Sequence, residues 1–286
     1  MTYEDFLNNL EKRLHKKLHK GEQIRPIQVL KNNGLKLDGF SYRIPGHREQ
    51  PTVYVNDYYK EDITLEKIDQ IANLVLHIQR TCKLFSDQEV TEVLNYEQMK
   101  GRIFYRLISR EKNETLLEQV PWLPWLDLAI VFYLRIPEYM INNATALIRM
   151  EHLEYWGIGM EELYQAAAVN MSCASVVFEP MEHFLEYYGL ESLTSGMYVL
   201  TNKRKEYGAA VIIDPKVQRM CFQVFQEDYC VLPSSIHELI LFPKSLAFEQ
   251  QELNLLVQEV NASCVSEEDY LSGHVYYYSS ATETLS

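Results

Sequence analysis

The sequence predicts an α+β protein with a mixed, mostly antiparallel sheet, flanking helices and a smaller N-terminal helix–hairpin–helix subdomain. Two N-terminal stretches repeat apolar residues at three- and four-residue steps, the period of an amphipathic helix. The rest of the chain is dominated by short runs rich in Val, Ile, Tyr and Phe, separated by Gly, Asn and Pro, which are typical of strands. Helices lie between these runs without regular βαβ alternation, which favours α+β over α/β.

The N-terminal part begins with a helix over residues 2–18, where Thr2 is the expected N-cap and Asp5 completes a capping box. Two alternating runs then flank Asn32-Asn33-Gly34, whose residues tolerate positive φ, so we expect a hairpin. Residues 51–59 supply a third strand. Residues 64–82 are apolar over more than half of a helical circumference, which predicts a largely buried helix.

The second part alternates strands with short helices. The run at 126–136 is almost continuously apolar, which predicts a central strand buried on both faces, and the prolines at 121 and 124 are expected to break the chain before it. The other expected strands span 102–109, 143–150, 196–202, 208–214, 228–233, 237–243 and 274–279, and the expected helices span 160–170, 179–189, 248–261 and a short segment that starts at Ser266.

The length of 286 residues is compatible with one large domain or two small ones. Polarity rises over residues 86–101, so we expect an N-terminal subdomain over 1–100 and a C-terminal subdomain over 101–286. No low-complexity linker separates them, which predicts that they pack together.

Composition excludes several classes of function. The net charge of −13 repels phosphate, so nucleic-acid binding is not expected. The five cysteines form no CxxC pair and no zinc-like cluster, so we expect buried reduced thiols, no metal site and no cofactor. The N-terminus lacks a signal-peptide pattern and no run of 18 uncharged apolar residues exists, so we expect a cytoplasmic protein without a membrane span.

One segment, YCVLPSSIHELILFP, holds the weak catalytic candidates Ser234, Ser235, His237 and Glu238. In a strand, His237 and Glu238 would point to opposite faces, so the carboxylate could not orient the imidazole. In a helical turn, Ser235 and Glu238 would form a capping box that occupies both side chains. Neither geometry aligns a nucleophile, a base and an acid, and GxSxG, HExxH, Walker A and GxGxxG motifs are absent. We therefore expect a structural turn.

Two polar stretches are candidates for binding from an exposed surface. The loop KNNGLKLDG and the segment NDYY could together present polar and aromatic groups, although ordinary turn chemistry also explains them. The candidate binding residues are Asn32, Asn33, Asp38, Asn56, Tyr58 and Tyr59.

Six segments spread over nearly the whole chain carry a resemblance to a known family. They are KNNGLKLDG, PTVYVND, WLDLAIVFY, MYVLTNKRKEYGAAVI, VLPSSIHELILFP and LVQEVNASCVSEEDYLSGHVYYY. Together they resemble the bacterial family catalogued as domain of unknown function 5688, found mainly in anaerobic Firmicutes. The resemblance implies a cytoplasmic bacterial protein and assigns no catalytic residue.

Two hypotheses of function follow. The first is a non-enzymatic module that binds another protein, because catalytic motifs are missing and the chain has 20 tyrosines, a residue type that interfaces favour. The alternative is a hydrolase or small-ligand enzyme that uses His237 with a nearby serine and acids from elsewhere in the chain. The missing motifs favour a protein that is not an enzyme.

Overall fold

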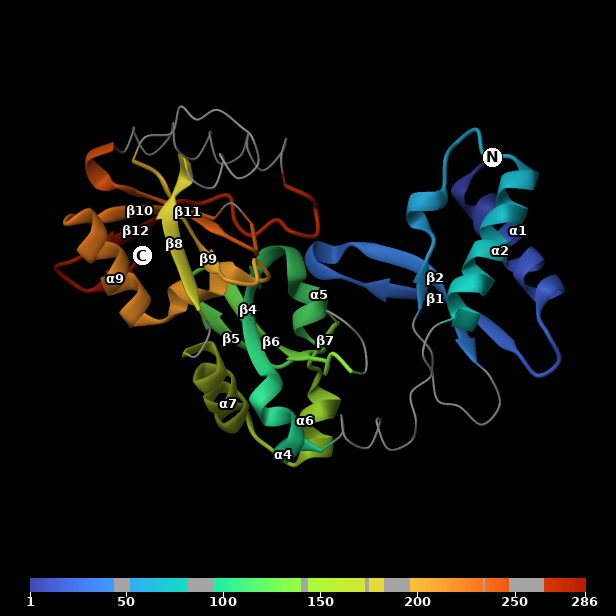
Figure 1. The fold of residues 1–286 in the computed structure, drawn as a ribbon, viewed down its shortest axis with the longest axis horizontal. Helices are drawn as coiled ribbons and strands as arrows, with labels where there is room; N and C mark the ends of the chain where they lie inside the picture. The colour runs from blue at the N-terminus through green and yellow to red at the C-terminus, as the bar shows by residue number, and fades with distance from the viewer. Residues whose placement is uncertain are drawn as a thin grey trace. The chain divides into compact units, whose positions relative to one another are not determined.

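The computed structural model describes residues 1–43, 52–81, 95–139, 144–172, 175–182, 196–233, 235–246 and 265–286 (Figure 1). The chain forms two compact units. Unit 1 consists of Met1–Lys31, Leu35–Asn95 and Pro137–Asn142, and unit 2 consists of Asn32–Gly34, Tyr96–Ile136 and Asn143–Ser286. That the N-terminal and C-terminal parts pack against each other stays a prediction.

Unit 1 begins with helix α1 (Tyr3–Lys17), whose capping box is confirmed. Asp5 donates its backbone N–H to the Thr2 hydroxyl at 3.1 Å, and the Asp5 carboxylate accepts from the backbone N–H of Thr2 at 3.4 Å. These bonds satisfy N–H groups that would have no partner at a helix start.

The predicted hairpin is present. Strands β1 (Gln23–Leu30) and β2 (Lys36–Arg43) pair antiparallel, and β3 (Val53–Tyr54) adds to β2. The third strand is shorter than expected, because the chain turns into a single 3₁₀ turn, η2 (Asn56–Tyr58).

Helix α2 (Leu65–Thr81) follows, and Thr64 accepts a hydrogen bond from its first turn as expected. The core of unit 1 joins one face of each helix to β2, and its buried members include Phe6, Leu10, Leu14, Phe40, Tyr42, Ile68, Ile71 and Val75. The expectation that α2 is largely buried is wrong in extent: Leu65 and Leu74 are 50% and 41% exposed. The apolar arc is therefore wider than the buried face.

A partly exposed ion pair connects the segment after α1 to the end of α2. The Arg80 guanidinium donates to both carboxylate oxygens of Glu22, at 3.1 and 2.7 Å, and the His19 backbone N–H adds a bond of 2.7 Å. The hydrogen bonds from Arg80 are the main reason why the pKa of Glu22 falls to about 2, from an ordinary value of 4.5.

We expect Glu22→Gln to lower the stability of unit 1 at pH 7 by roughly 1.5–3 kcal/mol, the range for hydrogen bonds to a charged group. Because the folded carboxylate has the lower pKa, its contribution is complete above about pH 4.5 and is lost as the pH falls toward 2. The difference between the variant and the wild type should therefore shrink over that range. Urea unfolding measures this difference in stability. The unfolding of unit 1 is followed by the methyl NMR signal of Ala72, which is buried in α2. The exposed control Glu61→Gln should change little at either pH, and a Glu22→Gln effect that is independent of pH would contradict the assignment.

The first sheet of unit 2 is built around the apolar run. Strand β6 (Leu128–Arg135) is the central strand, as predicted, with β4 (Ile103–Ser109) on one side and β5 (Trp122–Trp125) and β7 (Thr145–Leu147) on the other. The expectation of a chain break at the two prolines is wrong, because Pro124 lies within β5. Strand β5 pairs only with β6 among the described strands, so the missing N–H of Pro124 can face away from the ladder.

The second sheet has the order β13-β12-β10-β11-β9-β8, and every described strand pair is antiparallel. Figure 1 shows these strands in the yellow to red part of the chain. Their bounds are β8 (Val176–Pro180), β9 (Tyr198–Asn202), β10 (Tyr229–Leu232), β11 (Leu239–Pro243), β12 (Tyr276–Ser279) and β13 (Thr284–Leu285).

Helices and single turns of unit 2 connect and cover the sheets. They are η1 (Asn32–Gly34), α4 (Tyr96–Met99), η3 (Lys100–Arg102), η4 (Glu111–Asn113), α5 (Glu114–Leu117), α6 (Met150–Trp156), α7 (Met160–Ser172), η5 (Gly208–Ile213), α9 (Pro215–Phe225) and η6 (Lys244–Leu246). Helices α6 and α9 were not expected from the sequence. Within the described residues no helix combines the length and the apolar character needed to cross a bilayer.

Four local predictions are wrong or fall outside the description. The run at 208–214 is the 3₁₀ helix η5 instead of a strand, because both neighbouring positions beside β9 are occupied by β8 and β11. Ser266 starts a turn instead of a helix, although its hydroxyl does bond Asp269 as expected. The expected helix at 248–261 and most of the one at 179–189 lie outside the described residues. The predicted α+β class is confirmed.

Candidate ligand-binding site

The segment with the catalytic candidates forms the turn between β10 and β11. The Ser235 hydroxyl donates to the Glu238 carboxylate at 2.6 Å and accepts from the His237 backbone N–H at 3.0 Å. Ser235 is 5% exposed. The segment therefore forms a turn without the capping box considered above, and its serine oxygen contacts the backbone of His237, not its imidazole. Ser234 lies outside the described residues.

Both ring nitrogens of His237 have partners. Nδ1 accepts from the Tyr207 backbone N–H at 3.1 Å, which places the imidazole proton of the neutral ring on Nε2. Nε2 faces the Asp269 carboxylate at 3.1 Å, and the Tyr207 ring stacks on the imidazole at a centroid distance of 5.5 Å. This arrangement fixes the ring and leaves no nitrogen directed at a serine.

Two of the binding candidates are buried, so the expected exposed polar loop is not observed for them. Asn32 and Asn33 are 2% and 7% exposed. The Asn33 backbone N–H donates to Asn113 Oδ1 at 2.8 Å, and Asn113 Nδ2 donates back to Asn33 Oδ1 at 2.9 Å. The Asn32 and Asn33 side-chain amides also donate to backbone carbonyls of residues 267, 268 and 270. Their observed contacts are structural.

The remaining binding candidates lie in unit 1 and support its fold. Asp38 accepts from the Tyr3 hydroxyl at 3.0 Å, and its backbone N–H donates to Asn56 Oδ1 at 2.9 Å. The Tyr59 hydroxyl donates to the backbone carbonyl of Met1 at 2.7 Å, and Tyr58 packs against the core. A role of these residues in binding a partner stays a prediction.

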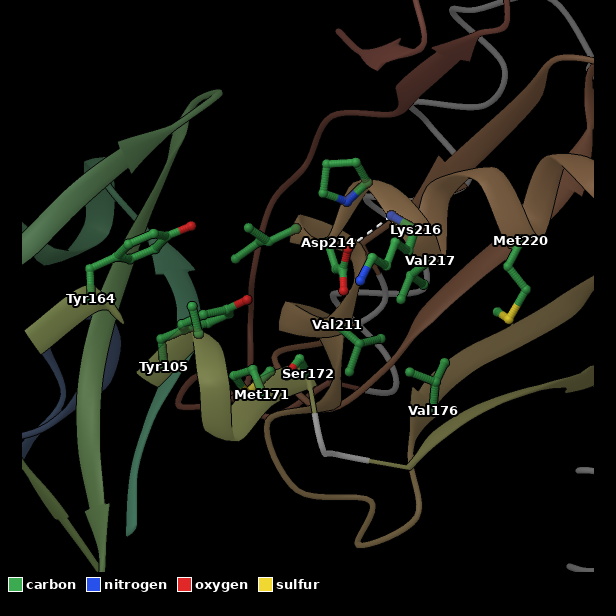
Figure 2. A pocket seen from close by; sticks show the side chains of 13 residues that line it. Tyr105, Tyr164, Met171, Ser172, Val176, Val211, Asp214, Lys216, Val217 and Met220 are labelled. Carbon is green, nitrogen blue, oxygen red and sulfur yellow. Dashed lines mark hydrogen bonds between the residues drawn. The ribbon is translucent and has the colours of Figure 1, made fainter. Parts of the chain in front are cut away.

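A cavity of about 430 Å³ lies in unit 2, between β4, α7, the start of β8, η5 and α9 (Figure 2). This volume is typical of small-molecule sites, which occupy roughly 300–1,000 Å³. Helix α7 lines it with one face, because Tyr164, Ala168 and Met171 recur at helical spacing. The other lining residues are Tyr105, Ser172, Val176, Val211, Ile213, Asp214, Pro215, Lys216, Val217 and Met220.

Two parallel tyrosine rings form one wall. Tyr105 of β4 stacks on Tyr164 of α7 with a centroid distance of 6.2 Å and an interplanar angle of 9°. Figure 2 shows both hydroxyls directed away from the strand and the helix that carry them, toward the η5–α9 side. Tyr105 is only 4% exposed, and its hydroxyl has no hydrogen-bond partner among the described residues. Burial, followed by the nearby Tyr164 and Asp214, raises the pKa of Tyr105, so its hydroxyl keeps its proton at neutral pH.

The opposite side of the cavity carries two charged side chains at the start of α9. Asp214 is the N-cap of this helix, and one carboxylate oxygen accepts from the Lys216 backbone N–H at 2.8 Å. In the described part of the chain, neither Asp214 nor Lys216 has an ion-pair partner. The cavity is therefore apolar along most of its wall, with hydroxyl groups on one side and opposite charges on the other.

The groups that line the cavity offer apolar contacts, hydrogen bonds and charge to a small molecule. Because its pKa is raised, Tyr105 stays protonated at neutral pH and can donate a hydrogen bond but cannot accept a proton as a base. The Ser172 hydroxyl donates to a backbone carbonyl of its own helix at 2.8 Å. Among the described residues no group of three His, Cys, Asp or Glu side chains lies close enough to hold a metal ion.

Sequence reasoning missed this cavity because its residues come from segments that are far apart in the chain. One local signal was available: Asp214 followed by Pro215 is a typical start of a helix, an N-cap and an N1 proline. That signal would have predicted α9 and placed Asp214 and Lys216 at its N-terminus.

The structure is that of an α+β protein with a preformed cavity in its larger unit. Comparison with family models adds that residues 3–280 match the Family of unknown function (DUF5688). The chain belongs to this family. No curated protein and no solved structure matches the chain.

Proposed function

We propose that the protein is a non-enzymatic binding module whose cavity holds a small, mostly apolar molecule with one polar group. The Tyr105 hydroxyl, which has no hydrogen-bond partner among the described residues and borders a cavity of about 430 Å³, is the observation that carries this proposal. A hydroxyl without a protein partner at the wall of a mostly apolar cavity can bond a polar group of the ligand and fix its orientation.

The apolar lining explains the rest of the ligand. Met171, Val176, Val211 and Met220 offer aliphatic and thioether contacts, and methionine adapts to ligands of irregular shape. We also propose that the protein acts in the cytoplasm, which the buried free thiols of Cys221 and Cys230 support. Binding to another protein stays a prediction from composition and does not conflict with a ligand in the cavity.

Methionine methyl NMR tests this proposal on the full chain. We expect benzamide and toluene to shift the methyl signals of Met171 and Met220 and to leave that of Met99, which is buried outside the cavity, unchanged. Tyr105→Phe should weaken benzamide binding by roughly 2- to 10-fold, the loss of one hydrogen bond, and should leave toluene binding unchanged.

The matched control is Tyr155→Phe, because this tyrosine is 64% exposed and outside the cavity lining. It should bind both probes as the wild type does. The proposal fails if neither probe moves the two cavity methyl signals, or if Tyr105→Phe affects both probes equally.

A further inference from the structure

The face of the first sheet opposite the cavity carries two arginines. Successive strand residues point to opposite faces, so Tyr105 faces the cavity and Arg106 faces away from it. Arg135 of β6 lies on the same face as Arg106. Phe104 of β4 pairs directly with Tyr133 of β6, so these two side chains share a face. Arg106 lies two residues after Phe104, and Arg135 lies two residues after Tyr133, so both arginines share that face as well.

Aromatic rings hold both guanidinium groups. The Arg106 guanidinium lies 4.6 Å from the centre of the Tyr207 ring, and that of Arg135 lies 3.7 Å from the centre of the Phe104 ring. Arg135 also donates to the Tyr133 hydroxyl at 3.3 Å. The Tyr207 and Tyr133 rings meet edge to face at 4.9 Å, so the two arginines belong to one aromatic cluster.

Neither arginine has an ion-pair partner among the described residues, and the Nε atom of each is buried without a hydrogen bond. Two carboxylates at the margin of the aromatic cluster have other partners: Asp269 contacts His237 at 3.1 Å, and Glu206 contacts Arg204 at 3.7 Å. Arginine keeps its charge in proteins, and a half-buried charge without a counter-ion is unfavourable. Two such charges on one face would be stabilised by an anion from outside the chain.

Hydroxyl groups of the same cluster add to the polar surroundings. Thr145 pairs with Arg135 across β6 and β7 and therefore shares its face of the sheet. The Thr145 and Tyr207 hydroxyls lie 3.5 Å apart. Guanidinium forks and hydroxyl donors together are the groups that recognise phosphate and carboxylate oxygens.

We propose that Arg106 and Arg135 form a binding site for the oxyanion of a small molecule, assisted by the hydroxyls of Thr145 and Tyr207. A phosphate group carries close to two negative charges at neutral pH and so matches two unpaired cations. A carboxylate offers the same hydrogen-bond geometry with one charge. The net charge of −13 disfavours general anion binding, so a saturable response points to a built site.

NMR of the full chain labelled with ¹⁵N-arginine tests this site with inorganic phosphate, titrated against chloride at constant ionic strength. We expect saturable shifts of the Nε–Hε signals of Arg106 and Arg135. Arg110 is the internal control, because it is exposed and lies over Trp122 at 5.4 Å, a similar ring contact outside the cluster. A parallel titration with acetate distinguishes a carboxylate ligand from a phosphorylated one. A similar response to both anions indicates a carboxylate ligand, and a response to phosphate alone indicates a phosphorylated ligand.

Variants complete the test. Arg106→Gln and Arg135→Gln should each weaken phosphate binding by about tenfold or more, because each removes a charged fork, whereas Arg110→Gln should not. If a glutamine variant does not fold, Arg106→Lys keeps the charge, loses the fork and should still bind more weakly than the wild type. The proposal is overturned if millimolar phosphate and acetate leave both signals unchanged, or if Arg110 responds equally.

Discussion

Gly208→Ala should destabilise unit 2 by about 3 kcal/mol, the upper part of the range for overpacking a closely packed site. A Cβ at this position would overlap the Thr201 hydroxyl and would lie 2.5 Å from the His237 carbonyl oxygen and 2.7 Å from the Asn202 backbone nitrogen. Two of these three neighbours are backbone atoms, which cannot rotate away. The Thr201 hydroxyl also donates to the His237 carbonyl at 2.8 Å, and the new methyl group would separate them.

Thermal and urea unfolding measure this loss, and a fall in Tm of roughly 6–12 °C corresponds to it for a unit of this size. Gly101→Ala is the matched control, because nothing lies within 4 Å of a Cβ added there. It should change stability by less than about 0.5 kcal/mol. A Gly208→Ala protein as stable as this control would show that η5 does not pack against β9 and the 235–238 turn as described.

Asn113→Ala should destabilise unit 2 by roughly 2–4 kcal/mol, because it leaves two buried groups without partners. Asn113 is 1% exposed; it accepts from the Asn33 backbone N–H and donates to the Asn33 side-chain oxygen. Its amide also donates to the Ser109 carbonyl at 2.8 Å, so the truncation removes three hydrogen bonds.

A double-mutant cycle separates this contact from the general effect of truncation. Asn33→Gly is the suitable partner, because Asn33 has a φ of 58° that glycine adopts without strain. One of the bonds joins the two side chains, so each single variant already removes it. In urea unfolding, the loss of stability in the double variant should therefore be smaller than the sum of the two single losses, by about 1 kcal/mol or more. Strictly additive losses would mean that the paired amides do not interact in solution.

The sequence predicted those elements whose signals are local. Helix α1 begins at its Thr2 cap, α2 follows Thr64, and the hairpin turns at Asn32–Gly34 because such patterns act over a few residues. The run at 208–214 was misassigned because a short apolar run suits a strand, a helix or a tight turn equally, and only the occupied neighbours of β9 decide among them.

The functional groups were harder to predict because their partners are remote. Ser235 and Glu238 do contact each other over three residues, but their side chains bond each other instead of forming the capping box that the sequence pattern allowed. Sequence reasoning could not find Tyr207 and Asp269, which hold His237 from 30 and 32 residues away. Nor could it separate the buried Asn33 from an exposed loop asparagine, because burial depends on Asn113, 80 residues further along the chain.

The strand order of the six-stranded sheet has a consequence for how unit 2 folds during synthesis on the ribosome. Strand β10 pairs on one side with β11, which follows it closely in the sequence, and on the other side with β12, which is synthesised later. Until the ribosome has released residues 276–279, the growing polypeptide presents an open, apolar hydrogen-bonding edge, and such an edge is prone to intermolecular pairing. Chaperone demand on the nascent chain should therefore be highest in the interval between the emergence of β10 and that of β12.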